Sequence, residues 1–333
     1  MILPYRGFGN PERAFLRGRI LEKVEIQPEH NDIDFWGNLL NMYRRFESDG
    51  IPNARLKVIY GGNQLEITCD DEGYFETYLE QGVPIQSDDL WATADLELLL
   101  ASESPLEPCT TQAKILIPPS SSDYGVISDI DDTIVQTGAT NLINTLRTIF
   151  FKDASARLPV PGFSLFYRSL HNGISGMSRN PLFYVSSSPW NLYDLLFDFI
   201  KLHEIPLDPV LLLRDYDITR EDVFLSGHTR HKLKYIQIIL DMYPAMPFIL
   251  IGDNGQDDPE VYAQIDQQYP DRIMAIYFRE VDKSTERSGE IQSLLDKCPE
   301  TRSKTIFADD ILQMASHARD MRWIIDNSLN DAV

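Results

Sequence analysis

The chain has 333 residues, a length that accommodates two domains. Its 43% of hydrophobic and 24% of charged residues are ordinary for a globular protein, and no stretch comes near the roughly 18 consecutive apolar residues that indicate a membrane span. With 51 acidic against 30 basic residues, the net charge of −21 argues against nucleic-acid binding and against adsorption to anionic lipid by charge alone.

The first fifteen residues contain no apolar segment behind a basic start, so we expect no secretory signal. Cys69, Cys109 and Cys298 are odd in number, widely spaced and without a CxxC pair, which fits reduced thiols better than a disulfide framework or a zinc site. We therefore expect a cytoplasmic protein. The oligomeric state stays open.

Residues 1–118 are predicted to form a β-rich, sandwich-like N-terminal domain. Between Arg13 and Ile117, short alternating segments are separated by turns at 61–63 and 71–73, whose glycine, asparagine and aspartate residues suit hairpins. Residues 32–52 have apolar spacing closer to that of a helix, which predicts a helical insertion. Because no ionisable cluster here looks catalytic, we expect a binding or targeting role.

A Pro/Ser-rich break at 117–123 precedes the second predicted domain, residues 119–333. Beyond it, apolar runs alternate with helical patterns; the runs are 124–128, 181–185, 209–213, 247–251 and 272–281. Such alternation predicts a parallel sheet with helices on both faces. Ligands of such sheets bind in the loops after the carboxyl ends of the strands.

Polar residues suited to one chemistry occupy these loops or the start of a helix: Asp129, Asp131, Asp132, Ser186, Lys232, Asp253, Asp257 and Asp258. Carboxylates from two loops make an oxygen site suited to Mg²⁺. A hydroxyl and an ammonium can share the charge of a transferring phosphoryl group. One carboxylate can attack phosphorus to form an aspartyl-phosphate, and the carboxyl two residues later can act as general acid and base. The pattern predicts Mg²⁺-dependent phosphoryl transfer.

The motifs "DIDDT", "YVSSS", Lys232 and "GDNGQDD" resemble motifs one to four of the haloacid dehalogenase (HAD) superfamily, in the same order. More narrowly, "SDIDDTI", "FYVSSSPWNLYD" and "FILIGDNGQDDPEVY" resemble the actin-patch-associated phosphatidate phosphatase family, a distant relation of the lipins. The likeness covers 124–281 and is weaker in 42–58. It implies a HAD-like Rossmannoid parallel sheet with a small cap inserted at about 134–180.

The resemblance implies a role for each matching residue. Asp129 would be the nucleophile and Asp131 the general acid/base. The implied Mg²⁺ ligands are Asp129, the backbone carbonyl of Asp131 and Asp253, with Asp257 in support. The implied ligands of the phosphoryl oxygens are Ser186 and Lys232.

Several assignments keep an alternative. Either Asp257 or Asp258 could serve only to stabilise the N-terminus of the following helix. Lys234, two positions away, is the alternative to Lys232 as the lysine that binds the phosphoryl oxygens. The same question stays open for Ser186 against Ser187. Asp132 and Thr133 could be loop and helix-capping residues. The candidates for substrate contact that could equally be the polar start of a helix are His228, Arg230 and His231.

The resemblance points to a phosphate monoester substrate, a lipid phosphate, and specifically to phosphatidate. The apolar segment 141–151 in the predicted cap suits a lipid, although a helix packed on the core has the same composition. We expect no nucleic-acid partner and no transmembrane segment, with peripheral membrane contact left open. Two alternatives remain: the same reaction on a soluble phosphomonoester or phosphoprotein, and a phosphoacceptor signalling or binding protein without turnover.

Overall fold

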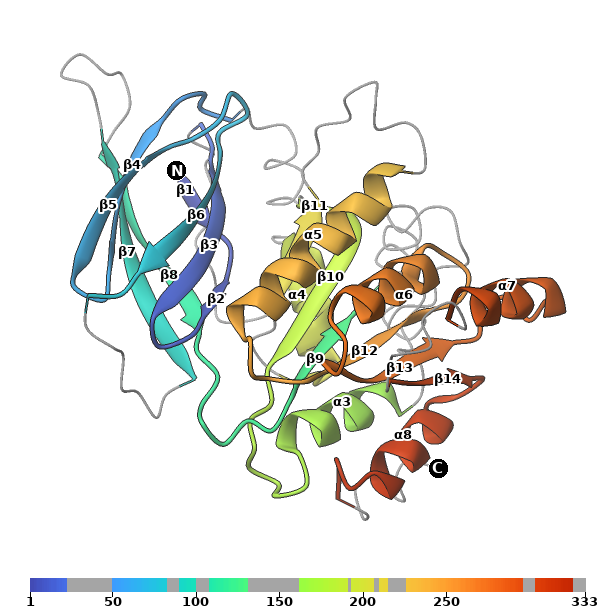
Figure 1. Cartoon of the computed structure of the whole chain (residues 1–333). Coiled ribbons are helices and arrows are strands. Elements are labelled where there is room, and N and C mark those ends of the chain that lie inside the picture. The colour runs from blue at the N-terminus through green and yellow to red at the C-terminus, as the bar shows by residue number, and fades with distance from the viewer. Residues whose placement is uncertain are drawn as a thin grey trace. The chain divides into compact units, whose positions relative to one another are not determined.

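The structure, a computed structural model, is shown in Figure 1. It describes residues 1–22, 50–82, 90–99, 108–130, 162–190, 193–206, 210–214, 226–295 and 303–325. Two compact units are present, the first Met1–Ser120 with Asn191–Phe197 and the second Ser121–Trp190 with Asp198–Val333. Asp131, Asp132 and the predicted helical segment up to residue 49 lie outside the described residues.

The described part of the first unit contains one eight-stranded sheet, in the order β1-β3-β2-β8-β7-β4-β5, with β6 paired to β3. Its strands are β1 (Ile2–Pro4), β2 (Gly7–Gly9), β3 (Arg13–Ile20), β4 (Arg55–Tyr60), β5 (Asn63–Thr68), β6 (Tyr74–Glu80), β7 (Trp91–Leu99) and β8 (Thr110–Leu116). Side chains of β7 alternate between buried and exposed, because one face of the sheet packs on the core and the other meets solvent.

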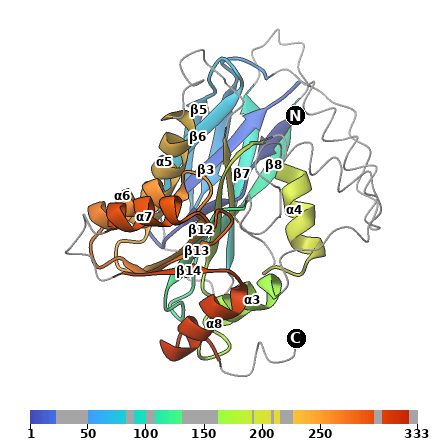
Figure 2. The ribbon, with the colours of Figure 1, turned by 90° about the vertical axis from the view of Figure 1, so that its right-hand side faces the viewer.

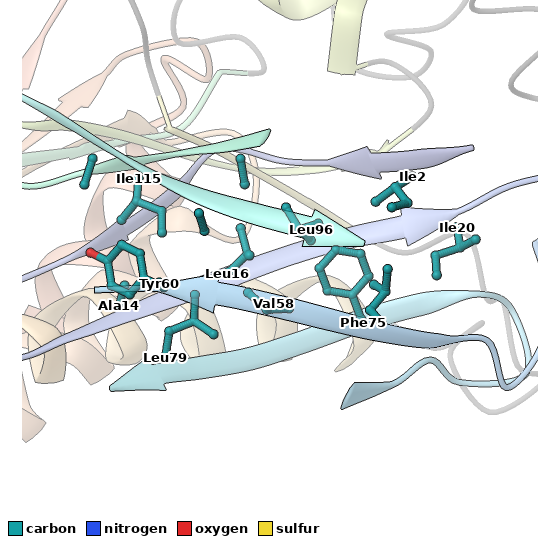
Figure 3. Close-up of a cluster of buried hydrophobic side chains, with 14 of the residues drawn as sticks. Ile2, Ala14, Leu16, Ile20, Val58, Tyr60, Phe75, Leu79, Leu96 and Ile115 are labelled. Atoms are coloured by element: carbon teal, nitrogen blue, oxygen red, sulfur yellow. The ribbon is translucent and has the colours of Figure 1, made fainter. Parts of the chain in front are cut away.

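The buried side chains of different strands face a common core, drawn in Figure 3, where Leu16, Val58, Phe75, Leu96 and Ile115 come from five strands. The strands are those expected of a sandwich, but they form one sheet instead of two. The short strand β2 joins them, because it pairs with β3 on one side and with β8 on the other. Three residues are too few to show a period of two in the sequence.

The described part of the second unit contains a parallel six-stranded sheet, in the order β11-β10-β9-β12-β13-β14. Its strands are β9 (Gly125–Ser128), β10 (Leu182–Pro189), β11 (Val210–Arg214), β12 (Phe248–Asp253), β13 (Ile273–Arg279) and β14 (Lys304–Ala308). All six residues of β12 are buried. The predicted parallel sheet of buried strands is confirmed.

Helices follow the strands and lie on both faces of this sheet. They are α3 (Phe163–Asn172), α4 (Tyr193–Leu202), α5 (Ser226–Met242), α6 (Asp258–Gln268), α7 (Thr285–Leu295) and α8 (Ile311–Asp320). Figure 2 shows α5, α6 and α7 on one side of the strands and α3 and α8 on the other. No described helix is both long and apolar enough to cross a bilayer.

Helix α3 occupies residues that the sequence placed in the cap. Its Phe166 and Tyr167 are fully buried, and their rings contact those of Tyr277 and Tyr184 in the sheet. This part of the predicted insertion is therefore a core helix. Residues 134–161 of the predicted cap lie outside the described residues.

The chain changes direction between β9 and β12, which are neighbours in the sheet. From β9 it proceeds to β10 on one side, and from β12 to β13 on the other. In open parallel sheets, the crevice at the carboxyl ends of two such strands is where ligands bind. The predicted site residues that the structure describes, Asp129, Ser186, Lys232, Asp253 and Asp257, lie at this edge.

Candidate active site

Asp129 and Asp253 lie at the carboxyl ends of the two central strands, and both are buried. The N–H of Asp129 donates to the carbonyl of Ile251 at 2.9 Å, so the sheet pairing continues into the acidic loop. Asp253 Oδ1 accepts from the N–H groups of Gly255 and Gln256 at 2.7 and 3.0 Å. These bonds fix the direction of the Asp253 carboxylate.

A third buried carboxylate, that of Asp258 at the start of α6, completes the cluster. Its Oδ2 accepts from the N–H of Asp253 at 3.2 Å. Asp129, Asp253 and Asp258 each place one carboxylate oxygen within 4.8 Å of the others. A Cβ at position 252 would lie 2.4 Å from Asp258 Oδ2, so this approach requires Gly252.

Lys232, on α5, lies between two of these carboxylates. Its Nζ is 2.8 Å from Asp129 Oδ1 and 2.5 Å from Asp258 Oδ1, and the side chain is buried. Burial by itself lowers the pKa of Lys232, but the charges of Asp129 and Asp258 and their hydrogen bonds outweigh that effect and raise it above the ordinary value. The ammonium is therefore protonated at neutral pH, and it holds two carboxylates together.

Among the described residues, three carboxylates and one ammonium leave the cluster with a formal charge of −2. Like charges at this spacing in a buried site cost free energy unless a cation or protons compensate them. One divalent cation balances the remaining charge. Carboxylate oxygens are the donors that Mg²⁺ prefers, so the residues present fit this ion.

The third carboxylate of the cluster is that of Asp258. The resemblance had implied Asp257 as the supporting ligand. Asp257 is the N-cap residue of α6 and is only half-buried. Its Oδ2 accepts from the Thr229 hydroxyl at 3.2 Å, which ties the first turn of α5 to the loop after β12. The two aspartates are neighbours in the sequence. One is half-buried and the other buried, because α6 begins between them.

Ser186 lies on β10, the neighbour of β9, and is fully buried. Because Tyr184 pairs with Ser128, the register places Ser186 at the same edge of the sheet as the acidic loop. Its Oγ accepts from the N–H of Ser188 at 3.0 Å. Ser187 is half-buried.

Two residues without a predicted role, Ser128 and Tyr167, support Asp129 through hydrogen bonds. The Ser128 hydroxyl donates to the carbonyl of Asp129 at 2.6 Å, and the Tyr167 hydroxyl is 2.5 Å from Ser128 Oγ. Burial raises the pKa of Tyr167 well above its usual value, so the group stays a phenol. Ser128 is visible beside the motif, whereas no sequence signal points to Tyr167 on α3.

Residues 124–280 match the model of a family described as "Phosphatidate phosphatase APP1, catalytic domain". This segment is similar to that family. The match contains Asp129, Ser186, Lys232, Asp253 and Asp258. It confirms the narrower resemblance, to the phosphatidate phosphatase family, that the motifs indicated.

Two curated relatives extend beyond this chain. Phosphatidate phosphatase APP1 of Saccharomyces cerevisiae is 35% identical over 276 residues, which cover 81% of this chain and 45% of the yeast protein. An uncharacterized protein of Schizosaccharomyces pombe is 27% identical over 165 residues, which cover 47% of this chain and 25% of that protein. The chain thus spans less than half the length of either relative.

Among solved structures, a carbohydrate acetylesterase from Xanthomonas citri matches with a TM-score of 0.29 and 10% identity, over 91% of this chain and 66% of that one. So low a score carries no argument about the fold or the activity.

Proposed function

We propose that this protein is a Mg²⁺-dependent phosphatidate phosphatase, which releases diacylglycerol and phosphate through an aspartyl-phosphate on a HAD-like catalytic domain. The observation that carries the proposal is the buried cluster of Asp129, Lys232, Asp253 and Asp258 inside the segment that matches the model of the phosphatidate phosphatase family. A buried acidic cluster with a lysine, at the ligand-binding edge of a parallel sheet, is suited to phosphoryl transfer.

In the proposed reaction, a carboxylate oxygen of Asp129 attacks phosphorus, and the bond from phosphorus to the diacylglycerol oxygen breaks. Asp131, which lies outside the described residues, gives its proton to that leaving oxygen. Asp131 then takes a proton from water. The oxygen of this deprotonated water attacks phosphorus, and the bond between phosphorus and the Asp129 oxygen breaks. Phosphate is released and the Asp129 carboxylate is restored.

Lys232 would serve both the nucleophile and the substrate. An ammonium has three N–H donors, and two of them reach Asp129 and Asp258. The third can bind an oxygen of the phosphoryl group, as can the hydroxyl of Ser186. The positive charge of Lys232, 2.8 Å from Asp129 Oδ1, also favours the anionic carboxylate that attack requires.

Asp129, Asp253 and Asp258, with the backbone carbonyl of Asp131, would hold Mg²⁺. When bound, the ion supplies positive charge that offsets the charge of the phosphoryl oxygens. Gly255 and Gln256 orient the Asp253 carboxylate through their N–H groups. Cytoplasmic location and peripheral contact with a lipid surface remain parts of the proposal.

The substrate is tested by measuring phosphate release from phosphatidate in mixed micelles, beside a panel of soluble phosphomonoesters and a phosphoprotein. We expect release from phosphatidate with Mg²⁺, none after chelation with EDTA, and recovery when Mg²⁺ is restored. Faster phosphate release from the soluble compounds would contradict the lipid substrate but not the proposed reaction mechanism. A stable phosphoprotein without phosphate release would favour a phosphoacceptor protein.

The neighbours Asp257 and Asp258 provide a matched pair for testing the cation site. We expect Asp258→Asn to weaken Mg²⁺ binding about 10–100-fold, because the variant loses one anionic oxygen ligand and one of the two carboxylate partners of Lys232. Asp257→Asn removes the same charge but only the contact with Thr229, so its effect should be smaller. Titration calorimetry on metal-free protein measures both, and a larger loss in the Asp257 variant would contradict the assignment.

A further inference from the structure

Arg287 lies on α7, beyond the segment 124–280 that matches the family, and its guanidinium binds the loop after β12. Its Nε donates to the carbonyl of Asn254 at 2.9 Å, and its Nη2 donates to the carbonyl of Gln256 at 2.7 Å. Both terminal nitrogens also bind the Glu260 carboxylate on α6, at 2.8 and 3.1 Å. One side chain thus connects the loop, α6 and α7.

The loop that Arg287 binds is the one that orients Asp253. The carbonyl of Asn254 and the N–H of Gly255 belong to the same peptide group. Arg287 binds the oxygen of this group, and Asp253 Oδ1 binds its N–H. Hydrogen bonds at both ends hold the plane of the peptide and polarise it, which strengthens each of them. The direction of the Asp253 carboxylate is therefore linked to the guanidinium.

A planar guanidinium is suited to this arrangement because its N–H groups leave in fixed directions toward two carbonyls and a carboxylate. A lysine ammonium offers a single point of attachment and cannot reproduce this geometry. The loop also has a second anchor, since Asn254 Oδ1 accepts from the N–H groups of Val281 and Asp282 at 2.8 and 2.9 Å. Substitution of Arg287 should therefore loosen the loop without unfolding the domain.

We propose that Arg287 is a positioning residue for the cation site, which holds the Asn254–Gly255 peptide so that Asp253 presents its carboxylate in the cluster with Asp129 and Asp258. The inference rests on the proposed function, because it assumes that this cluster binds Mg²⁺. It adds a residue that touches neither the substrate nor the ion.

The test compares Arg287→Gln and Arg287→Lys with Lys283→Gln in the full chain. Lys283 lies nearby and forms an exposed ion pair with Asp309, so its substitution removes the same charge without touching the loop. Titration calorimetry with Mg²⁺ should show about 10–100-fold weaker binding for Arg287→Gln, an intermediate loss for Arg287→Lys, and no change for Lys283→Gln.

A second measurement requires no metal. Hydrogen exchange followed by mass spectrometry should be faster in the peptide 253–258 of metal-free Arg287→Gln than in the wild type, and unchanged in Lys283→Gln. Unaltered Mg²⁺ affinity and exchange in a folded Arg287→Gln would overturn the inference. Should that variant fail to fold, wild-type behaviour of Arg287→Lys would overturn it in the same way.

The wild-type titration separates the two proposals. If the wild type binds Mg²⁺ and both Arg287 variants bind it equally well, the positioning role fails and the proposed function stands. If the wild type binds no Mg²⁺, both proposals fail.

Discussion

Replacing Asp129 by asparagine should lower phosphate release from phosphatidate by at least about four orders of magnitude, the scale on which loss of a nucleophile acts. An amide has nearly the same shape as the carboxylate, but it lacks the anionic oxygen that attacks phosphorus. The fold should persist, because the substitution removes a charge from a crowded acidic cluster. Single-turnover assays with the wild type and the variant measure the difference.

Asp309→Asn is the control for this experiment. Asp309 belongs to the same unit, and its exposed carboxylate pairs with Lys283 away from the cluster. We expect full activity from this variant. Appreciable turnover by Asp129→Asn, with an unfolding transition like that of the wild type, would show that another group attacks phosphorus.

Replacing Lys232 by methionine should lower the free energy of unfolding by about 3–5 kcal/mol in the presence of EDTA, the cost of removing one partner from a buried ion pair. The variant leaves Asp129 and Asp258 buried without the ammonium that bridges them. Saturating Mg²⁺ should restore part of the loss, since an ion that binds only the folded state stabilises it. Urea unfolding with EDTA and with Mg²⁺ measures both effects.

The loss in Lys232→Met should depend on pH with a defined sign. Without the ammonium, the buried carboxylates repel one another more strongly while they are ionised, and uptake of protons relieves this repulsion. The penalty is therefore present at neutral pH and diminishes as pH falls and the carboxylates take up protons. An opposite dependence would contradict the electrostatic explanation.

Lys234→Met is the matched control for Lys232. Lys234 is exposed, and its ammonium lies 5.0 Å from the centre of the Tyr235 ring, a contact worth about 0.5–1 kcal/mol at most in such a setting. Lys232 and Lys234 are two positions apart, and the sequence left open which of them binds the phosphoryl group. Equal losses of stability and activity in the two variants would remove the bridging role of Lys232.

Much of the architecture followed from the sequence, because local patterns decide it. A hairpin turn was predicted at 61–63. Tyr60 pairs with Asn63 across Gly61 and Gly62, whose φ values of +53° and +82° suit a two-residue hairpin loop. Runs of buried apolar residues became parallel strands, and the polar residues after them lie at one edge of the sheet. Asp129 and Asp253 were predicted in this way, whereas Lys232 was predicted from its place near the start of a helix.

Other features depend on contacts between distant segments or on where a helix begins. The sequence did not distinguish Asp257 from Asp258, because each is an aspartate at the start of the same helix. The boundary of α6 makes Asp257 the half-buried N-cap and Asp258 the buried partner of Lys232. The strand β2, too short for a periodic pattern, joins the N-terminal strands into a single sheet.

At the site, Tyr167 and Arg287 are two further residues whose contacts the sequence could not predict. Each lies on a helix that carries no motif, and each reaches the motif loops only because the sheet brings that helix beside them. The sequence by itself determined which residue types could hold and transfer a phosphoryl group. The tertiary structure decided which copies of those residues meet and what supports them, because neither burial nor side-chain direction is set by neighbours along the chain.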